Sequence, residues 1–125
     1  MSLPAIELVS IVDDDPFVRA ATCSLVRSIG WEARAFASAS DFLASGVPSC
    51  TRCLICDIQM PVMGGIELLE CLEREGLRVP TLFISAFATA RTRERVQASP
   101  ALCLIEKPID AAELEVWIGR ALGRG

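Results

Sequence analysis

The feature that most constrains the fold is a set of four short apolar runs that each end in a charged or hydroxyl residue. Unbroken apolar runs of this length are typical of strands that are buried on both faces of a parallel sheet. The carboxyl ends of parallel strands lie at one edge of the sheet, so we expect all four polar ends to meet there. The runs are Ile11-Val12-Asp13-Asp14, Leu54-Ile55-Cys56-Asp57, Leu82-Phe83-Ile84-Ser85 and Leu104-Ile105-Glu106-Lys107-Pro108.

Stretches with helical character lie between these runs, so strands and helices alternate along the chain. Such alternation is the signature of βαβ units with right-handed crossovers. It predicts the α/β class, as a single doubly wound (βα)5 domain with a five-stranded parallel sheet, flavodoxin-like. The expected strands cover residues 7–12, 31–36, 52–56, 81–84 and 102–105. The expected helices cover residues 16–29, 38–45, 66–75, 89–99 and 111–121.

Capping residues mark the ends of several of these helices. Asp15-Pro16, Ser38 and Asp110 are suited to begin a helix, and Gly30 is suited to end one. Within the first helix the apolar residues Phe17, Ala21, Leu25 and Ile29 recur at helical spacing and predict its inward face.

We predict the strand order 2-1-3-4-5. In open parallel sheets a ligand binds beyond the carboxyl ends of the strands, where the strand order reverses. In this order the first and third strands are neighbours, so Asp13, Asp14 and Asp57 should lie within a few ångströms of one another.

The length and composition fit one globular domain. A chain of 125 residues can bury a single core, here expected over about residues 7–122 within a domain of 1–125. The apolar fraction of 52% argues against disorder, and no apolar run approaches the roughly 20 residues needed to cross a bilayer. The start lacks the features of a signal peptide, so we expect a cytoplasmic protein with no membrane partner. The net charge of −4 gives no electrostatic reason for direct nucleic-acid binding.

The six cysteines include a run with metal-like spacing, Cys50-x-x-Cys53-x-x-Cys56. Residues three apart on a strand point to opposite faces, so these sulfurs should not converge. The chain also has no histidine to complete a zinc site. We therefore expect buried structural thiols, with no bound metal and no disulfide.

The carboxylates at the sheet edge predict a metal and phosphoryl site. Three carboxylates in one pocket repel one another, and a hard divalent cation such as Mg²⁺ relieves that repulsion. Asp13 and Asp14 suit the ligand role. Asp57, alone on its strand, is then free to act as a nucleophile that forms an aspartyl-phosphate.

Lys107 suits the cationic partner of that phosphoryl group. It is the only lysine in a chain with eleven arginines, and it directly follows a buried strand. A compact ammonium fits a phosphoryl or carboxylate oxygen where a planar guanidinium does not. A plain surface lysine is the alternative, and Ser85 could equally be a strand-end cap or turn residue.

With the residues in this arrangement, the chain resembles the receiver domain of two-component response regulators, and most of all the FixJ-like branch. The resemblance covers about residues 7–122. It rests on the acidic run 13–15, on Asp57-Ile58-Gln59-Met60-Pro61-Val62-Met63-Gly64-Gly65 and on Glu106-Lys107-Pro108.

The resemblance implies a role for each of these residues. Asp57 would accept a phosphoryl group from a sensor histidine kinase. The metal ligands would be Asp13, Asp14, Asp57 and the main-chain carbonyl of Gln59, with Mg²⁺ as the ion and Mn²⁺ able to replace it. Lys107 would contact the phosphoryl group ahead of a cis peptide to Pro108, and the Ser85 hydroxyl would turn toward the same group.

Two positions depart from the family pattern or tune it. Leu104 stands where the family often has an aromatic switch residue, so aromatic switching is not expected. Phe87 occupies a position that tunes phosphate lifetime, and we predict that Phe87 and Gln59 shield the acyl phosphate from water.

The helix over 89–99 is the predicted output element, because it carries few apolar anchors. Phosphorylation should shift it and create a partner or homodimer face. DNA would be contacted only through an effector domain that is absent from this chain, in the manner of a transcription regulator. The arginines of this helix are better explained by a solvated face or a dimer seam than by nucleic-acid contact.

Two other readings stay open at this point. A haloacid-dehalogenase-like phosphohydrolase would use Asp13 as the nucleophile in Asp13-x-Asp15, but no acidic pair follows Lys107 and residues 57–61 stay unexplained. A degenerate receiver that signals by contact alone would not need Asp57, Lys107 and Ser85. The preferred prediction is a signalling phosphoacceptor and not an enzyme.

Overall fold

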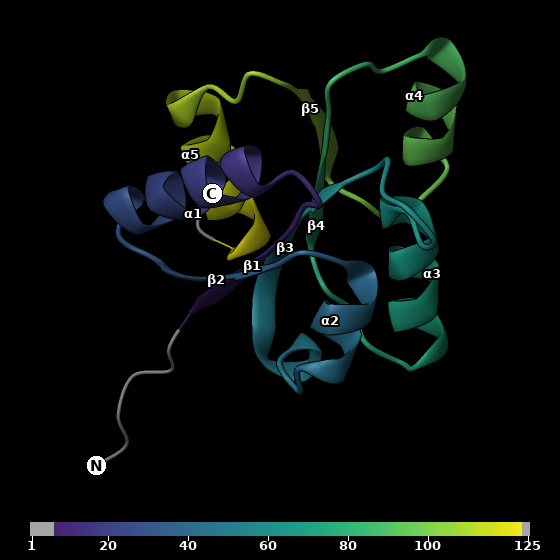
Figure 1. Cartoon of the computed structure of the whole chain (residues 1–125), viewed down its shortest axis with the longest axis horizontal. Helices are drawn as coiled ribbons and strands as arrows, with labels where there is room; N and C mark the ends of the chain where they lie inside the picture. The colour runs from purple at the N-terminus through teal and green to yellow at the C-terminus, as the bar shows by residue number, and fades with distance from the viewer. Residues whose placement is uncertain (1–6, 124–125) are drawn as a thin grey trace.

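The computed structural model describes residues 7–123 and shows one parallel sheet covered by helices on both faces (Figure 1). The strand order is β2-β1-β3-β4-β5, which confirms the predicted topology. The strands are β1 (Leu8–Val12), β2 (Glu32–Phe36), β3 (Thr51–Asp57), β4 (Thr81–Ser85) and β5 (Cys103–Glu106). The helices are α1 (Pro16–Ile29), α2 (Ala39–Ala44), the 3₁₀ turn η1 (Pro48–Cys50), α3 (Gly65–Arg74), α4 (Ala90–Gln97) and α5 (Ala111–Ala121). The chain start, on which the signal-peptide expectation rests, lies outside the described residues.

The elements begin and end close to the predicted residues, and the differences have local causes. β3 begins at Thr51 because its hydroxyl bonds to Ser10 Oγ and to the Val47 carbonyl, both at 2.7 Å. The helix caps behave as predicted: Asp15, Ser38 and Asp110 each accept a backbone N–H of the first turn. α4 is shorter than the predicted 89–99 because Thr89 caps it and Ala98 ends it.

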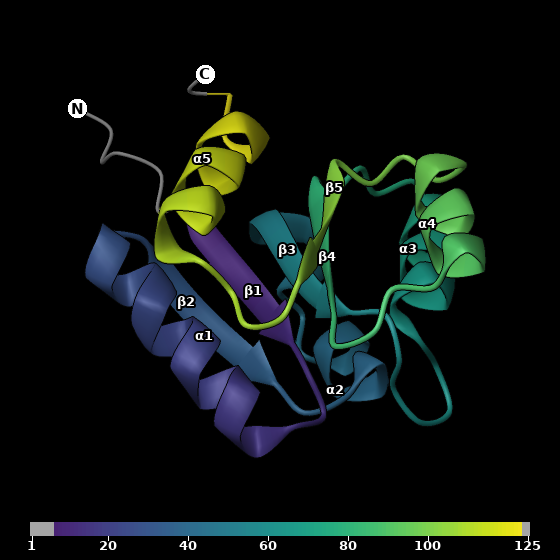
Figure 2. The ribbon, with the colours of Figure 1, turned by 90° about the horizontal axis from the view of Figure 1, so that it is seen from above.

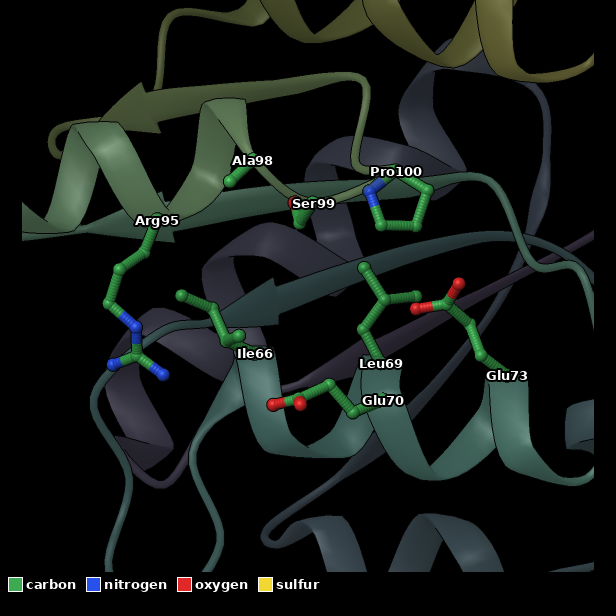
Figure 3. Close-up of a pocket in the computed structure, with 8 residues that line it drawn as sticks. All are labelled: Ile66, Leu69, Glu70, Glu73, Arg95, Ala98, Ser99 and Pro100. Atoms are coloured by element: carbon green, nitrogen blue, oxygen red, sulfur yellow. The ribbon is translucent and has the colours of Figure 1, made fainter.

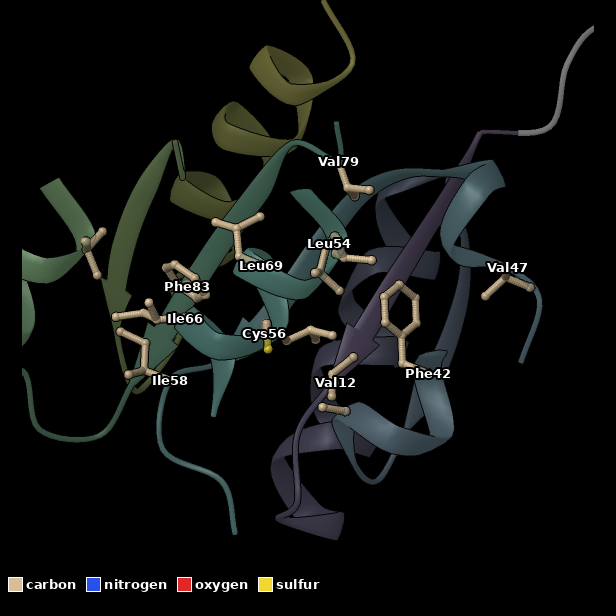
Figure 4. Packing of buried hydrophobic residues seen from close by; sticks show 14 of the residues in the cluster. Val12, Phe42, Val47, Leu54, Cys56, Ile58, Ile66, Leu69, Val79 and Phe83 are labelled. Atoms are coloured by element: carbon tan, nitrogen blue, oxygen red, sulfur yellow. The ribbon is translucent and has the colours of Figure 1, made fainter. Parts of the chain in front are cut away.

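Two apolar layers hold the helices to the sheet. One lies between the sheet and α2, α3 and α4, and Figure 4 shows Phe42, Leu54, Leu69 and Phe83 packed there. The other lies between the sheet and α1 and α5, which share one face in Figure 2. β1 and β4 are buried along their whole length, whereas Ala33 is the one buried residue of β2, as expected for an edge strand.

The predicted inward face of α1 is wrong at two residues. Phe17 is 86% exposed, and Ala21 is exposed as well. The buried residues of this helix are Thr22, Cys23 and Val26. α1 begins at the carboxyl edge of the sheet, so its first turn lies beside the loops and has no strand beneath it to cover Phe17.

The six cysteines are free thiols that differ in burial. The prediction of buried thiols is confirmed for Cys23, Cys53 and Cys56 and is wrong for the exposed Cys50, while Cys71 and Cys103 are half-buried. Cys53 and Cys56 are fully buried while Cys50 is exposed, so the metal-like run does not converge. Burial raises the pKa of the Cys53 thiol to about 12, which keeps it protonated. No helix among residues 7–123 combines the length and apolar character that spanning a bilayer requires.

Candidate functional site

The carboxyl edge of the sheet gathers an acidic cluster from two neighbouring strands. One carboxylate oxygen from each of Asp13, Asp14 and Asp57 lies within 4.8 Å of the others. Asp13 and Asp57 are buried at 0% and 6% exposure, whereas Asp14 is exposed. The pairing of β1 with β3 brings Val12 opposite Cys56 and thereby sets the residues that follow them side by side.

Lys107 supplies the positive charge that faces this cluster. Its Nζ lies 3.0 Å from Asp57 Oδ2 and 3.4 Å from Asp13 Oδ2. The Lys107 N–H donates to the Ser85 carbonyl at 2.9 Å, and the bond from Lys107 to Pro108 is a cis peptide. Burial alone would lower the pKa of Lys107, but the hydrogen bond to Asp57 and the two nearby carboxylate charges raise it above its usual value. The ammonium therefore stays charged at this edge.

Asp57 is held by contacts on both of its carboxylate oxygens. Oδ2 accepts from Lys107, and Oδ1 accepts from the backbone N–H of Gln59 at 3.0 Å. The start of α3 packs directly beneath it: a Cβ on Gly65 would lie 2.7 Å from the Asp57 carbonyl oxygen. The sequence therefore needs a glycine there for the β3–α3 loop to close behind Asp57.

Asp13 carries one carboxylate oxygen with no hydrogen bond. Its Oδ1 accepts from the Asp15 N–H at 2.9 Å, while Oδ2 is buried and unpartnered apart from the longer ion pair to Lys107. Burial raises the pKa of Asp13, and the charge of Asp57 raises it further. A cation bound beside Oδ2 would stabilise the charged carboxylate and so offset both the cost of burial and the repulsion by Asp57.

Ser85 presents a second unsatisfied atom. Its side chain is 1% exposed and its Oγ has no hydrogen-bond partner among the described residues. A buried hydroxyl without a partner is costly, so a group that binds here and accepts a hydrogen bond from it is favoured. The three carboxylates, whose oxygens include the buried and unpartnered Asp13 Oδ2, fit a hard divalent cation. The Ser85 hydroxyl and the Lys107 ammonium fit a phosphoryl group.

The remaining predicted residues lie around this centre. Leu104 is partly buried against the core beside α4. Gln59 is exposed next to Asp57. Phe87 is 80% exposed, so its side chain makes no buried contact over the site in this state.

Sequence reasoning missed two features of the rim. Val62 has a φ of 69° and is fully exposed, an unusual conformation for a β-branched residue. The guanidinium of Arg19 donates to the Asp13 carbonyl at 2.8 Å. The motif spacing that located the carboxylates carries no signal for either of them.

A separate depression lies between α3 and α4. It has a volume of about 430 Å³, with Ile66 and Leu69 on one side and Ala98 and Pro100 on the other (Figure 3). Arg95 of α4 reaches Glu67 of α3 at 3.3 Å near one end of it. α4 and α3 are therefore not closely packed along this depression.

Comparison with known proteins agrees with this geometry. Residues 9–118 match the family described as the response regulator receiver domain. The response regulator protein TodT of Pseudomonas putida is 36% identical over 92% of this chain and 51% of its own. The transcriptional regulatory protein FixJ of Azorhizobium caulinodans is 30% identical over 93% of this chain and 55% of its own.

A solved structure shows the same fold. The response regulator receiver protein from Burkholderia phymatum is 33% identical, with a TM-score of 0.82 over 95% of this chain and 97% of that one. The chain spans about half the length of the curated relatives it matches. The matched stretch includes residues 57–61, which the phosphohydrolase hypothesis left unexplained. The chain belongs to the response regulator receiver domain family and is a signalling phosphoacceptor of that family.

Proposed function

We propose that this chain accepts a phosphoryl group on Asp57 from a sensor histidine kinase and passes the signal to a transcriptional effector domain. The observation that carries the proposal is the Asp57 carboxylate, which lies 3.0 Å from Lys107 Nζ and within 4.8 Å of two further carboxylates. Relatives that are named as transcriptional regulators support the output. The effector domain lies outside this chain, and any DNA contact is made through it.

The residues divide the work of phosphoryl transfer. Asp13, Asp14, Asp57 and the carbonyl of Gln59 would hold Mg²⁺, or Mn²⁺ in its place, and the bound ion would neutralise charge on the phosphoryl oxygens. An Asp57 carboxylate oxygen bonds to phosphorus while the bond from phosphorus to the imidazole nitrogen of the kinase breaks. Lys107 and Ser85 contact the phosphoryl oxygens in the product.

The surface beside Lys107 suits a protein donor better than a small molecule alone. Phe17 projects from the first turn of α1 at 86% exposure. Next to it a depression of about 270 Å³ is lined by Val18, Ala21, Thr22, Leu25, Lys107, Pro108 and Ile109. An apolar surface beside a charged centre fits a kinase helix that carries the phosphohistidine. We therefore place the kinase on this side of the site.

α4 is the proposed output element. Val96 is its one buried residue, and two exposed ion pairs tie it to its neighbours, Arg93 with Glu106 and Arg95 with Glu67. Glu106 directly precedes Lys107, so a phosphoryl group that engages Lys107 also alters the anchor of α4. A shift of α4 would expose a partner or homodimer face. We place this signalling in the cytoplasm, where six unpaired thiols stay reduced.

We assign the tuning of phosphate lifetime to Gln59 and Phe87, which lie two residues after the ends of β3 and β4. Their side chains are exposed in the unphosphorylated chain and would fold over an acyl phosphate. Leu104 supplies an aliphatic surface in place of an aromatic switch.

Intact-mass spectrometry after incubation with acetyl phosphate and Mg²⁺ tests the proposal. We expect wild type to gain the mass of one phosphoryl group and Asp57→Asn to gain none. Asp15→Asn is the matched control, since it removes a nearby charge, keeps a helix cap and should be phosphorylated normally. Phosphorylation of Asp57→Asn, or repeated turnover of p-nitrophenyl phosphate, would overturn the assignment.

A further inference from the structure

Two arginines of α1 make the same kind of bond to different parts of the sheet. Arg19 Nη1 donates to the Asp13 carbonyl at 2.8 Å, and Arg27 Nη2 donates to the Ala33 carbonyl at 2.9 Å. They lie roughly two helical turns apart on one helix. The first bond ends on a residue of the acidic cluster, whereas the second ends on the edge strand β2.

The Arg19 bond completes a set that fixes Asp13. The Asp13 N–H donates to the Phe36 carbonyl at 3.1 Å, and Asp13 Oδ1 accepts from the Asp15 N–H at 2.9 Å. With the carbonyl held by Arg19, the one polar atom of Asp13 without a hydrogen bond is Oδ2. This atom is buried and lies 3.4 Å from Lys107 Nζ, so it faces the site.

The carbonyl that Arg19 holds belongs to the peptide that joins Asp13 to Asp14. Because a peptide is planar, fixing its oxygen also fixes the direction in which Asp14 leaves β1. Asp14 is exposed, and its side chain accepts no hydrogen bond among the described contacts. The position of the Asp14 carboxylate is therefore set mainly by the conformation of its backbone.

We infer that Arg19 is a positioning residue for the metal ligands, holding the Asp13–Asp14 peptide so that both carboxylates face one ion. The inference rests on the proposed Mg²⁺ site and adds to it a residue that touches neither the ion nor the phosphoryl group. Partners outside the ligand set commonly change metal affinity in this way.

The charge of Arg19 and its proposed positioning role predict opposite changes in Mg²⁺ affinity when the residue is replaced. A guanidinium near three carboxylates lowers the negative potential that attracts a cation, so charge alone predicts tighter Mg²⁺ binding when Arg19 is removed. Loss of positioning predicts weaker binding. The sign of the change therefore separates the two.

Isothermal titration with Mg²⁺ on the unphosphorylated chain is the test, with Arg19→Gln, Arg19→Lys and the matched control Arg27→Gln. We expect Arg19→Gln to weaken Mg²⁺ binding about tenfold, the lower end of the usual effect of such partners. Arg19→Lys should recover part of the affinity, because an ammonium can still donate to the carbonyl. Arg27→Gln should lose comparable stability in urea and keep the wild-type affinity.

Unchanged or tighter Mg²⁺ binding by Arg19→Gln would overturn the inference, as would equal weakening in Arg27→Gln. If Arg19→Gln does not fold, Arg19→Lys against Arg27→Gln decides in the same way. The proposed function fails separately: wild type would then neither bind Mg²⁺ nor take up a phosphoryl group. Normal binding and phosphorylation in wild type, with no effect at Arg19, would refute only the positioning role.

Discussion

The Lys107 ammonium lies 3.0 Å from Asp57 Oδ2, a contact between residues that are 50 positions apart in the chain. It exists because β3 and β5 end at the same edge of the sheet, with β4 between them. The same ammonium also lies 3.4 Å from Asp13 Oδ2. Lys107 is thus the ion-pair partner of both Asp13 and Asp57, and Asp14 adds a third carboxylate to the cluster. This excess of negative charge governs how the site responds to protons and to metal ions.

Asp13→Asn should stabilise the metal-free chain by about 1 kcal/mol, a common gain from relieving unfavourable charge. Burial and the charge of Asp57 raise the pKa of Asp13 above 3.8 in the folded state. The stability that comes with its proton is therefore fully present below pH 3.8 and is lost as the pH rises through the higher folded-state pKa. Urea unfolding across this pH range should show the decline in wild type and not in the variant.

Added Mg²⁺ should reverse the order of stability, so that wild type becomes more stable than Asp13→Asn. Wild type should gain stability with added Mg²⁺ near neutral pH, and Asp13→Asn should gain far less. Asp15→Asn, which lies outside the cluster and keeps its capping role, should behave as wild type. A variant that is less stable than wild type without metal would contradict this account of the repulsion.

Gly65→Ala should cost about 2 kcal/mol and slow phosphorylation, because overpacking in a tight contact typically costs 1–3 kcal/mol. The added Cβ would lie 2.7 Å from the Asp57 carbonyl oxygen and 2.9 Å from Phe83 Cε1, so the end of β3 must move. Gly30→Ala is the control: its φ of 111° makes it destabilising, but it lies at the far end of α1. Equal phosphorylation rates for the two variants would show that the contact does not position Asp57.

The sequence predicted the sheet order and the meeting of Asp13, Asp14 and Asp57, since both follow from buried strands whose polar ends share an edge. The sequence could not predict that the Phe17 side chain is exposed. Helical spacing identifies an apolar face, but whether a first turn has a strand beneath it depends on where the helix starts. The hydrogen bond from Arg19 to the Asp13 carbonyl could not be predicted either, because a bond to a backbone carbonyl does not depend on the type of the accepting residue. The depression beside α4 depends on how loosely two helices pack, which short apolar motifs do not record.

Phe17→Ala should reduce phosphorylation by a cognate kinase roughly tenfold, which corresponds to about 1.4 kcal/mol of lost transition-state binding. The phenyl ring is exposed one helical turn before Ala21, which lines the same depression as Lys107, so we expect the ring to contact a protein donor and not acetyl phosphate. Transfer from acetyl phosphate should be unchanged. Val116→Ala, another exposed apolar position but on α5, should leave both rates unaltered. A loss with both donors would place Phe17 in the site and not on the docking surface.

Phe87→Ala should shorten the lifetime of the acyl phosphate severalfold if the ring folds over it and excludes water. The measurement is loss of the phosphoryl mass with time after the donor is removed. Thr92→Ala, in the next element, is a control for a general loosening of this region. An unchanged lifetime in Phe87→Ala would leave the exposed ring without a role in hydrolysis and would direct attention to Gln59.

α4 should exchange its amide hydrogens faster when a phosphoryl analogue such as beryllofluoride occupies Asp57. The helix has one buried residue and two exposed ion pairs, so its attachment is weak and salt-sensitive. Arg93→Gln and Arg95→Gln should each raise exchange across Ala90–Gln97 even without the analogue, because each removes one tie to a neighbouring element. Arg91→Gln changes the same charge outside both pairs and should not. If the analogue leaves exchange in α4 unaltered while Lys107 is engaged, the signal must leave the site through another face, and the link from Lys107 through Glu106 to Arg93 would carry none of it.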